Sequence, residues 1–270
     1  MTSRRKRPTS PQARRKFLRT LVMSAGLLGT SLLGFIPVLG GWVRRLRPPG
    51  ALQEKQFLAA CIKCGQCVQV CPVEAIRLAD LDEGFGVGVP YINARAQACD
   101  FSCDGLQCVL ACPTGALTHE LNYSHETDMG IAKVVSPAAC LAAQGKGFKG
   151  QARGADFTGT LRYDTVDRWN PVPVRDHPYD LELCDLCVRQ CPIEIRIAQC
   201  DAGKPPSGDE RQCPPQHAIE LLPEVDEEGV TRMLPVILDG CVGCGVCEMI
   251  CPVEPGVIVI DSSEGGGVNV

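Results

Sequence analysis

A cysteine motif with the spacing C-x2-C-x2-C-x3-C-P occurs twice in this chain and constrains its fold more than any other feature. The two copies are Cys61, Cys64, Cys67 and Cys71 before Pro72, and Cys241, Cys244, Cys247 and Cys251 before Pro252. In two-cluster iron–sulfur domains, three thiolates at this spacing bind one cubane cluster, and the thiolate before the proline binds the neighbouring cluster. The repeated motif therefore predicts a chain that folds around [4Fe–4S] clusters.

A second, looser run lies between these two copies. It consists of Cys99, Cys103, Cys108 and Cys112 before Pro113. Its closing Cys-Pro is followed by Thr-Gly-Ala-Leu, which parallels the Val-Glu-Ala-Ile that follows Pro72. We interpret it as an internal duplicate of the first run.

The third run is incomplete in its local sequence. Cys184, Cys187 and Cys191 before Pro192 match the last three positions of the motif, and Cys140 lies 44 residues upstream as a possible opener. A distant ligand costs little extra, because the entropy of loop closure grows slowly with loop length. The alternative keeps the three cysteines as the opening and closes the run with Cys213 before Pro214. We favour Cys140, and both assignments stay open.

Four runs of four use sixteen of the 18 cysteines, enough for four [4Fe–4S] clusters. With Cys140 in the third run, the two left over are Cys200 and Cys213. Both lie in a Pro- and Gly-rich segment that has the composition of a surface loop. In an oxidising compartment they could form a disulfide, and otherwise they are two idle thiols.

Crossed ligation between runs allows two arrangements. If adjacent runs pair, the four ligand groups are Cys61, Cys64, Cys67 and Cys112; Cys99, Cys103, Cys108 and Cys71; Cys140, Cys184, Cys187 and Cys251; and Cys241, Cys244, Cys247 and Cys191. A nested arrangement, which pairs the first run with the fourth and the second with the third, fits the spacing equally well.

The expected fold class is α+β, with tandem bacterial-ferredoxin-like 2[4Fe–4S] modules, long loops and a preceding N-terminal apolar helix. Residues 1–47 form a leader, residues 48–130 hold runs one and two, and residues 131–270 hold runs three and four. Insertions interrupt the second module at about residues 145–182 and 197–223.

The N-terminus resembles a twin-arginine export signal. Arg14 and Arg15 are followed by Lys-Phe-Leu-Arg, and the 24 residues at positions 20–43 carry no charge. At about 1.5 Å per residue, a helix of that length spans a bilayer. A removed signal peptide and an uncleaved inner-membrane anchor both stay open, and either one predicts a periplasmic protein exported by the twin-arginine machinery.

Charge separates this leader from the rest of the chain. Eleven of the 27 basic side chains lie in residues 1–47, which hold no acidic one, so 16 basic and 31 acidic residues leave the remainder with a net charge of −15. Nucleic-acid binding requires a basic surface, so we exclude it for this part of the chain. The acidity suits docking on a positively charged redox partner, or it serves solubility.

No other cofactor or catalytic motif accompanies the cysteines. The sequence lacks C-x-x-C-H, a glycine-rich dinucleotide fingerprint and a phosphate-binding loop. The four histidines, at positions 119, 125, 177 and 217, lie far apart. We therefore expect an electron-transfer subunit with no catalytic residues, rather than a self-contained enzyme.

Taken together, the Arg14-Arg15 leader, the Arg-Leu-Arg-Pro-Pro-Gly-Ala segment at residues 45–51 and the four cysteine runs resemble the NapG/MauM family of ferredoxin-type proteins. The resemblance covers nearly the whole chain. A solitary cysteine that opens the third run is a trait of this family, which supports Cys140. The insertions at about 145–182 and 197–223 depart from the family pattern and leave the subfamily open.

The resemblance implies a function in electron transfer. A NapG-like protein would take electrons from an integral-membrane quinol dehydrogenase subunit and pass them to a periplasmic reductase or cytochrome, as in nitrate reduction. A MauM-like protein would instead be an accessory or maturation protein for an exported redox enzyme such as methylamine dehydrogenase.

Overall fold

The computed structural model describes residues 11–39, 45–80, 86–103, 105–150, 179–225 and 231–263. The chain divides into two compact units, one of residues 1–43 with 80–87 and the other of residues 44–79 with 88–270. We refer to the second unit as the body. Much of the insertion predicted at residues 145–182 lies outside the described residues.

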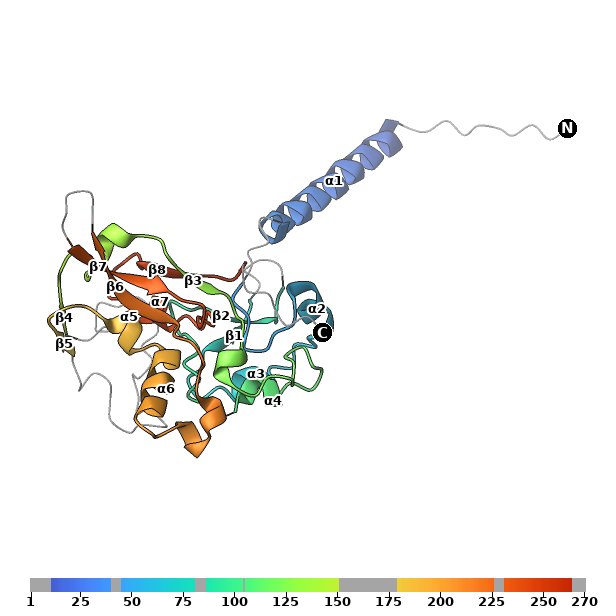
Figure 1. Ribbon diagram of the computed structural model, residues 1–270. Helices are drawn as coiled ribbons and strands as arrows, with labels where there is room; N and C mark the ends of the chain where they lie inside the picture. The colour runs from blue at the N-terminus through green and yellow to red at the C-terminus, as the bar shows by residue number, and fades with distance from the viewer. Residues whose placement is uncertain are drawn as a thin grey trace. The chain divides into compact units, whose positions relative to one another are not determined.

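The described part of the first unit contains the long helix α1 (Pro11–Leu39), which Figure 1 shows in blue. Arg14 and Arg15 lie in its first turns with exposed side chains, and the large apolar side chains between Phe17 and Leu28 are also exposed. Nowhere in the described parts of the chain does a helix combine the length and the apolar character needed to cross a membrane. Positions 40–43 of the uncharged stretch lie outside the described residues.

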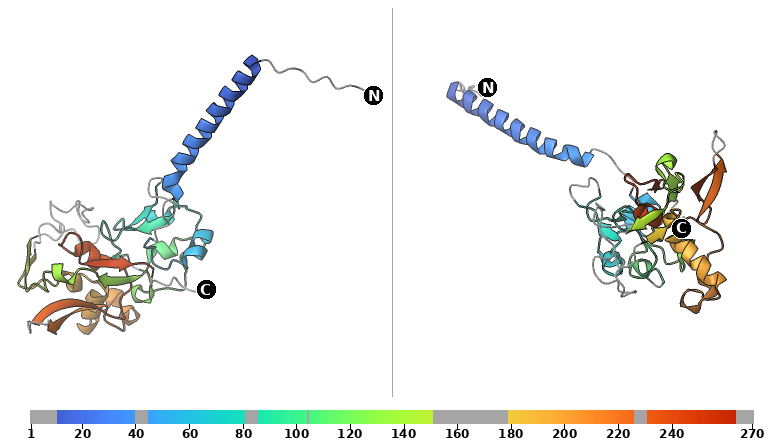
Figure 2. Two further views of the ribbon diagram at one scale, coloured as in Figure 1. Left: turned by 90° about the horizontal axis from the view of Figure 1, so that it is seen from above. Right: turned by 90° about the vertical axis from the view of Figure 1, so that its left-hand side faces the viewer.

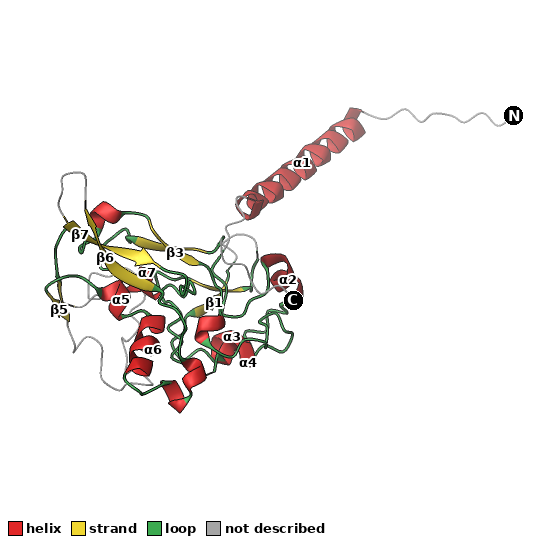
Figure 3. Cartoon of the chain, in the orientation of Figure 1, coloured by secondary structure: helices red, strands yellow, loops and turns green. Residues whose placement is uncertain are grey.

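The body consists of short helices and two-stranded sheets joined by long loops (Figure 3). Its α-helices are α2 (Glu54–Ala60), α3 (Gln66–Gln69), α4 (Gln107–Leu110), α5 (Leu186–Arg189), α6 (Pro192–Asp201) and α7 (Val246–Ile250). Its 3-10 helices are η2 (Ser124–Glu126), η3 (Pro137–Ala139), η5 (Pro206–Gly208) and η6 (Glu210–Gln212). Mixed helix and strand content agrees with the predicted α+β class.

The four sheets in the described part of the body are antiparallel pairs. They are β1 (Ile76–Leu78) with β2 (Pro90–Ile92), β3 (Ile131–Val134) with β8 (Ile258–Asp261), β4 (Phe148–Gly150) with β5 (Tyr179–Leu181), and β6 (Ile219–Val225) with β7 (Thr231–Ile237). The β3–β8 register runs from Ile131 opposite Asp261 to Val134 opposite Ile258, which joins the beginning and the end of the predicted second module.

The segment at residues 197–223 is more ordered than its composition suggested. Helix α6 extends through Cys200 to Asp201, and β6 begins at Ile219 and forms a long hairpin with β7. Both views of Figure 2 show this hairpin in orange at the edge of the body. The prediction of a surface loop was wrong for residues 219–223, because apolar Ile219 and Leu221 pair with Ile237 and Pro235 on β7.

Each cysteine run has the same local structure, a loop that leads into a short helix and ends at Cys-Pro. The third cysteine of each run lies within the helix: Cys67 in α3, Cys108 in α4, Cys187 in α5 and Cys247 in α7. The fourth follows the helix, where proline prevents its continuation. Because of this geometry, the fourth thiol of a run points away from the space that the first three thiols of that run share.

The main apolar core of the body contains side chains from both predicted modules, and a smaller cluster surrounds Leu186 and Ile250. Its most deeply buried side chains include Phe57 and Leu117 from the predicted first module and Ile193, Met249 and Ile258 from the second. Cysteines from both modules belong to the same cluster of core residues. The two predicted modules are therefore parts of one packed unit.

Arg95 connects the two parts of this unit through a hydrogen-bonded network. Its guanidinium donates to the carbonyl oxygens of Glu248 (2.6 Å), Cys251 (2.8 Å) and Val253 (3.0 Å) and to a carboxylate oxygen of Glu254 (2.6 Å). The last carbonyl groups of a helix lack partners within that helix. Arg95 supplies such partners at the end of α7, where the fourth run closes.

We expect Arg95→Met to destabilise the body by about 2 kcal/mol, because it removes charged hydrogen bonds and leaves partly buried carbonyls without these donors. The matched control is Arg189→Met. Arg189 is an exposed arginine that pairs with Asp185 one turn earlier, so its loss should cost about 0.5 kcal/mol or less. The midpoint of anaerobic guanidinium unfolding measures both effects. Equal midpoints for the two variants would contradict the role given to Arg95.

Candidate iron–sulfur cluster sites

The structure brings sixteen free cysteines of the body into four groups of four. In each group, three thiols come from one run and the fourth comes from the adjacent run. We call the groups the first set (Cys61, Cys64, Cys67, Cys112), the second set (Cys99, Cys103, Cys108, Cys71), the third set (Cys140, Cys184, Cys187, Cys251) and the fourth set (Cys241, Cys244, Cys247, Cys191). The structure thus has the adjacent arrangement of runs, not the nested one.

The first set surrounds a small pocket between α2 and α3. Its four cysteines line this pocket together with the buried side chains of Phe57 and Leu117. Helix α2, which carries Phe57, is held by Arg47, whose guanidinium makes two hydrogen bonds to Glu54 (2.9 and 2.6 Å) and lies 5.1 Å from the centre of the Phe57 ring. Residues 45–51, which the sequence connected only to a family resemblance, therefore support one wall of the first set.

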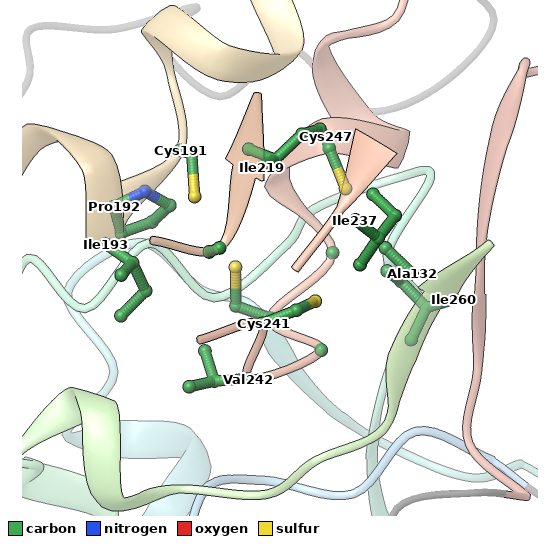
Figure 4. Close-up of a pocket in the computed structure, with 14 residues that line it drawn as sticks. Ala132, Cys191, Pro192, Ile193, Ile219, Ile237, Cys241, Val242, Cys247 and Ile260 are labelled. Atoms are coloured by element: carbon green, nitrogen blue, oxygen red, sulfur yellow. The ribbon is translucent and has the colours of Figure 1, made fainter. Parts of the chain in front are cut away.

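The fourth set lines a comparable pocket, shown in Figure 4. The sulfur atoms of Cys191 and Cys247 and those beside the Cys241 label lie around this pocket, and apolar side chains such as Ile193, Ile219 and Ile237 form its walls. Cys191 enters from the start of α6, whereas the other three thiols come from the loop before α7 and from α7 itself. The side chains that line this pocket provide sulfur atoms as metal ligands and are otherwise apolar.

The second and third sets are identified by the electrostatic interactions among their thiols. Cys108 interacts with Cys103 and Cys71, and Cys99 interacts with Cys103 and Cys108. In the third set, Cys187 interacts with Cys140, Cys184 and Cys251. Cys140 therefore lies with the third run, although it is distant in the sequence.

Cys213, the rival candidate for the third run, is instead joined to Cys200 in a disulfide with a Cα–Cα distance of 6.0 Å. This bond closes the loop between α6 and β6, which contains η5 and η6. The two cysteines that the sequence analysis left outside the clusters are thus paired with each other.

Burial makes these thiols difficult to ionise individually. Burial, reinforced by Cys61 and Cys64, raises the pKa of Cys67 to about 11. Burial and the neighbouring thiols of Cys140 and Cys184 raise the pKa of Cys187 to about 12, and burial raises the pKa of Cys244 still further. Several thiolates in one apolar space require positive charge among them. Iron supplies that charge, so the donor sets fit [4Fe–4S] clusters.

The four sets of thiols suit clusters rather than single metal ions. In a cubane cluster each thiolate binds a different iron atom, so the four sulfurs need not converge on one point. Within the described residues, no group of three or more His, Cys, Asp or Glu side chains is arranged to hold a single metal ion.

The segments that follow two of the Cys-Pro pairs return hydrogen bonds to the ligand sulfur. The amide of Ala75 donates to Cys71 Sγ (3.3 Å), and the amide of Leu117 donates to Cys112 Sγ (3.5 Å). Burial opposes ionisation of Cys112, but hydrogen bonds from Leu117 and Thr114 outweigh it and lower the pKa of this thiol. Such bonds favour the thiolate and adjust the potential of a cluster.

The histidines do not converge with one another in the described part of the chain. His119 Nε2 lies 3.0 Å from the Cys112 carbonyl oxygen, His125 stacks on Tyr123, and His217 pairs with Glu194 at 2.8 Å. His177 lies outside the described residues.

Sequence reasoning missed the structural roles of Arg95 and Arg47, because a single arginine in a loop carries no pattern that reveals its partners.

Family models match two segments that contain cysteine runs. A 4Fe-4S dicluster domain matches residues 60–143, and a 4Fe-4S binding domain matches residues 238–254. These matches support the prediction of an iron–sulfur protein of the ferredoxin type. No solved structure matches the chain.

Curated relatives match almost the full length. The ferredoxin-type protein NapG of Escherichia coli strain K12 is 32% identical over 97% of this chain and 91% of its own length. NapG of Haemophilus influenzae is 32% identical over 94% of this chain and 74% of its own length. The methylamine utilization ferredoxin-type protein MauM of Methylorubrum extorquens is 32% identical over 91% of this chain and 86% of its own length. The chain therefore belongs to the NapG and MauM family of ferredoxin-type, iron–sulfur electron-transfer proteins.

Proposed function

We propose that the chain holds four [4Fe–4S] clusters and carries electrons from a membrane quinol dehydrogenase subunit to a periplasmic reductase or cytochrome, as in nitrate reduction. The observation that carries this proposal is the division of sixteen free thiols into four sets, each with three cysteines from one run and one from its neighbour. A [4Fe–4S] cluster accepts and releases single electrons at potentials that its protein surroundings set.

The residues of the chain hold, shield and adjust these groups. Buried apolar side chains such as Phe57 and Ile193 keep water from the sets, and the amides of Ala75 and Leu117 donate to the sulfurs of Cys71 and Cys112. Both effects alter the balance between the oxidised and reduced states of a cluster. Holding clusters and adjusting their potentials requires no catalytic acid, base or nucleophile.

Export by the twin-arginine machinery is part of the proposal. Arg14 and Arg15 are exposed near the start of α1, as recognition by an export receptor requires. The Cys200–Cys213 disulfide suits an oxidising compartment such as the periplasm. The net negative charge outside the leader would steer the body toward a positively charged redox partner.

A second candidate function is service to an exported redox enzyme of methylamine utilization, as an accessory or maturation protein. The observation in its favour is that the MauM relative is as similar to this chain as the NapG relatives are, at 32% identity.

The cluster count is tested by removing single ligands. Cys64→Ser and Cys244→Ser should each lose about a quarter of the iron, because each removes a ligand from one of four sets. As a control, the double variant Cys200→Ser, Cys213→Ser should retain all of it. Iron is counted per protein after anaerobic purification. Loss of a quarter of the iron from the control would show that these cysteines are ligands.

The two candidate functions differ in their response to quinol. An electron carrier should be reduced by quinol in the presence of its membrane partner within the turnover time of the pathway, which bleaching of the visible cluster absorbance measures. Clusters that stay oxidised, in a protein whose deletion leaves an exported enzyme without its cofactor, would favour the MauM-like function.

The export assignment predicts that Arg14→Lys combined with Arg15→Lys leaves the protein in the cytoplasm. Cell fractionation and immunoblotting measure the distribution. Replacement of Arg4 and Arg5 by lysine is the matched control, because these arginines lie outside the motif. Normal export of the Arg14, Arg15 variant would refute the leader assignment.

A further inference from the structure

The second and fourth cysteine runs meet at a close backbone contact. The amide of Cys99 donates to the carbonyl oxygen of Cys244 (3.3 Å), and the amide of Ala98 donates to the sulfur of Met249 in α7 (3.2 Å). Cys99 and Cys244 are each 7% exposed, and Arg95 makes its four hydrogen bonds to run four and the residues just after it at the same place. We call this contact the junction.

Two pairs of short helices connect the remaining sets. Helix α3, with Cys67 of the first set, packs against α4, with Cys108 of the second set. Helix α5, with Cys187 of the third set, packs against α7, with Cys247 of the fourth set. The thiols follow these contacts: Cys67 interacts electrostatically with Cys108, Cys99 with Cys244, and Cys187 with Cys247.

From these contacts we infer that the four sets form a row in the order first, second, fourth, third, joined at the junction, and that Gly245 is the residue that positions the junction. The order differs from that of the runs in the sequence. The inference rests on the proposed function only in requiring that all four sets hold clusters.

Gly245 permits the close approach at the junction. Its φ of +90° lies in the left-handed region, and a Cβ at this position would lie 2.5 Å from the Cβ and 3.3 Å from the Cα of Ala94, and 3.5 Å from the Cβ of Ala98. Ala94 and Ala98 are both buried, so the neighbouring backbone would have to move. A side chain here would therefore separate the second set from the fourth.

Gly65 occupies the same position in the first run and provides a natural comparison. Its φ of +74° is similar, but a Cβ there would meet only Leu78 Cδ1, at 3.8 Å. Alanine at position 65 therefore strains the local loop without affecting the junction. Comparing alanine at position 245 with alanine at position 65 therefore separates the effect on the contact between the second and fourth sets from the effect of local strain in the loop.

One end of the row, the first set, differs from the middle in exposure. Cys64 of the first set is the one exposed thiol among the sixteen free cysteines, whereas the junction cysteines are buried. In the proposed electron-transfer role, this places a surface for a redox partner at the first set, which is one end of the row.

The order is tested by electron paramagnetic resonance of the fully reduced, anaerobically purified full-length chain, because neighbouring paramagnetic clusters broaden each other's signals. Cys241→Ala and Cys184→Ala should each lose about a quarter of the iron. Removing the fourth set by Cys241→Ala should isolate the third and produce one sharp, unbroadened signal. Removing the third set by Cys184→Ala should leave the other three interacting. The reverse pattern would show a row in sequence order and overturn the inference.

The role of Gly245 is tested with all four sets intact. Gly245→Ala should weaken the broadening between the second and fourth sets while the iron content stays complete, and Gly65→Ala should leave the wild-type spectrum. Equal spectra for the two variants would overturn the positioning role of Gly245. If Gly245→Ala does not fold, the two cysteine variants still decide the order. An iron content well below four clusters in the unmodified protein would contradict the proposed function instead.

Discussion

The structure depends on offsetting the free-energy cost of burying several thiolates together in apolar spaces. Burial and neighbouring sulfurs together raise the pKa values of Cys67 and Cys187, so these groups do not ionise readily without compensating positive charge. Iron–sulfur clusters provide that charge and at the same time bind four separate points of the chain. Ligation thereby connects the folding free energy of the body directly to the occupancy of the sets.

This coupling explains why so little regular structure is sufficient. The helices that carry the third cysteine of each run have only four or five residues, too few to be stable alone. The sheets are isolated pairs of strands, and aromatic residues make up only 5% of the chain. In the proposed function, crossed ligation would supply the long-range connections that larger sheets and aromatic cores provide in other proteins. Because each set takes three thiols from one run and the fourth from the adjacent run, each set is complete only when both runs are folded.

The sequence was informative where chemistry imposes a fixed spacing. Most cysteines of a run lie a few residues apart, so the runs could be recognised from their spacing. For the third run, spacing left both Cys140 and Cys213 open, and the resemblance to the family favoured Cys140. The adjacent arrangement of runs could not be derived, because the fourth ligand of a set is limited only by loop closure, which spacing barely constrains. Arg95 was equally hidden, since its acceptors are backbone carbonyls about 150 residues away that have no signature in the sequence.

The junction shows how one glycine can satisfy two constraints that the sequence cannot distinguish. Gly65 and Gly245 occupy the same place in the motif, and both have the left-handed conformation that the loop before the helix requires. Only Gly245 also faces the other half of the body, where Ala94 and Ala98 leave no space for a side chain. The small residues on both sides allow the backbones of runs two and four to meet, and this brings the second and fourth sets together. The order of the sets in space therefore follows from packing at the junction rather than from the order of the runs in the chain.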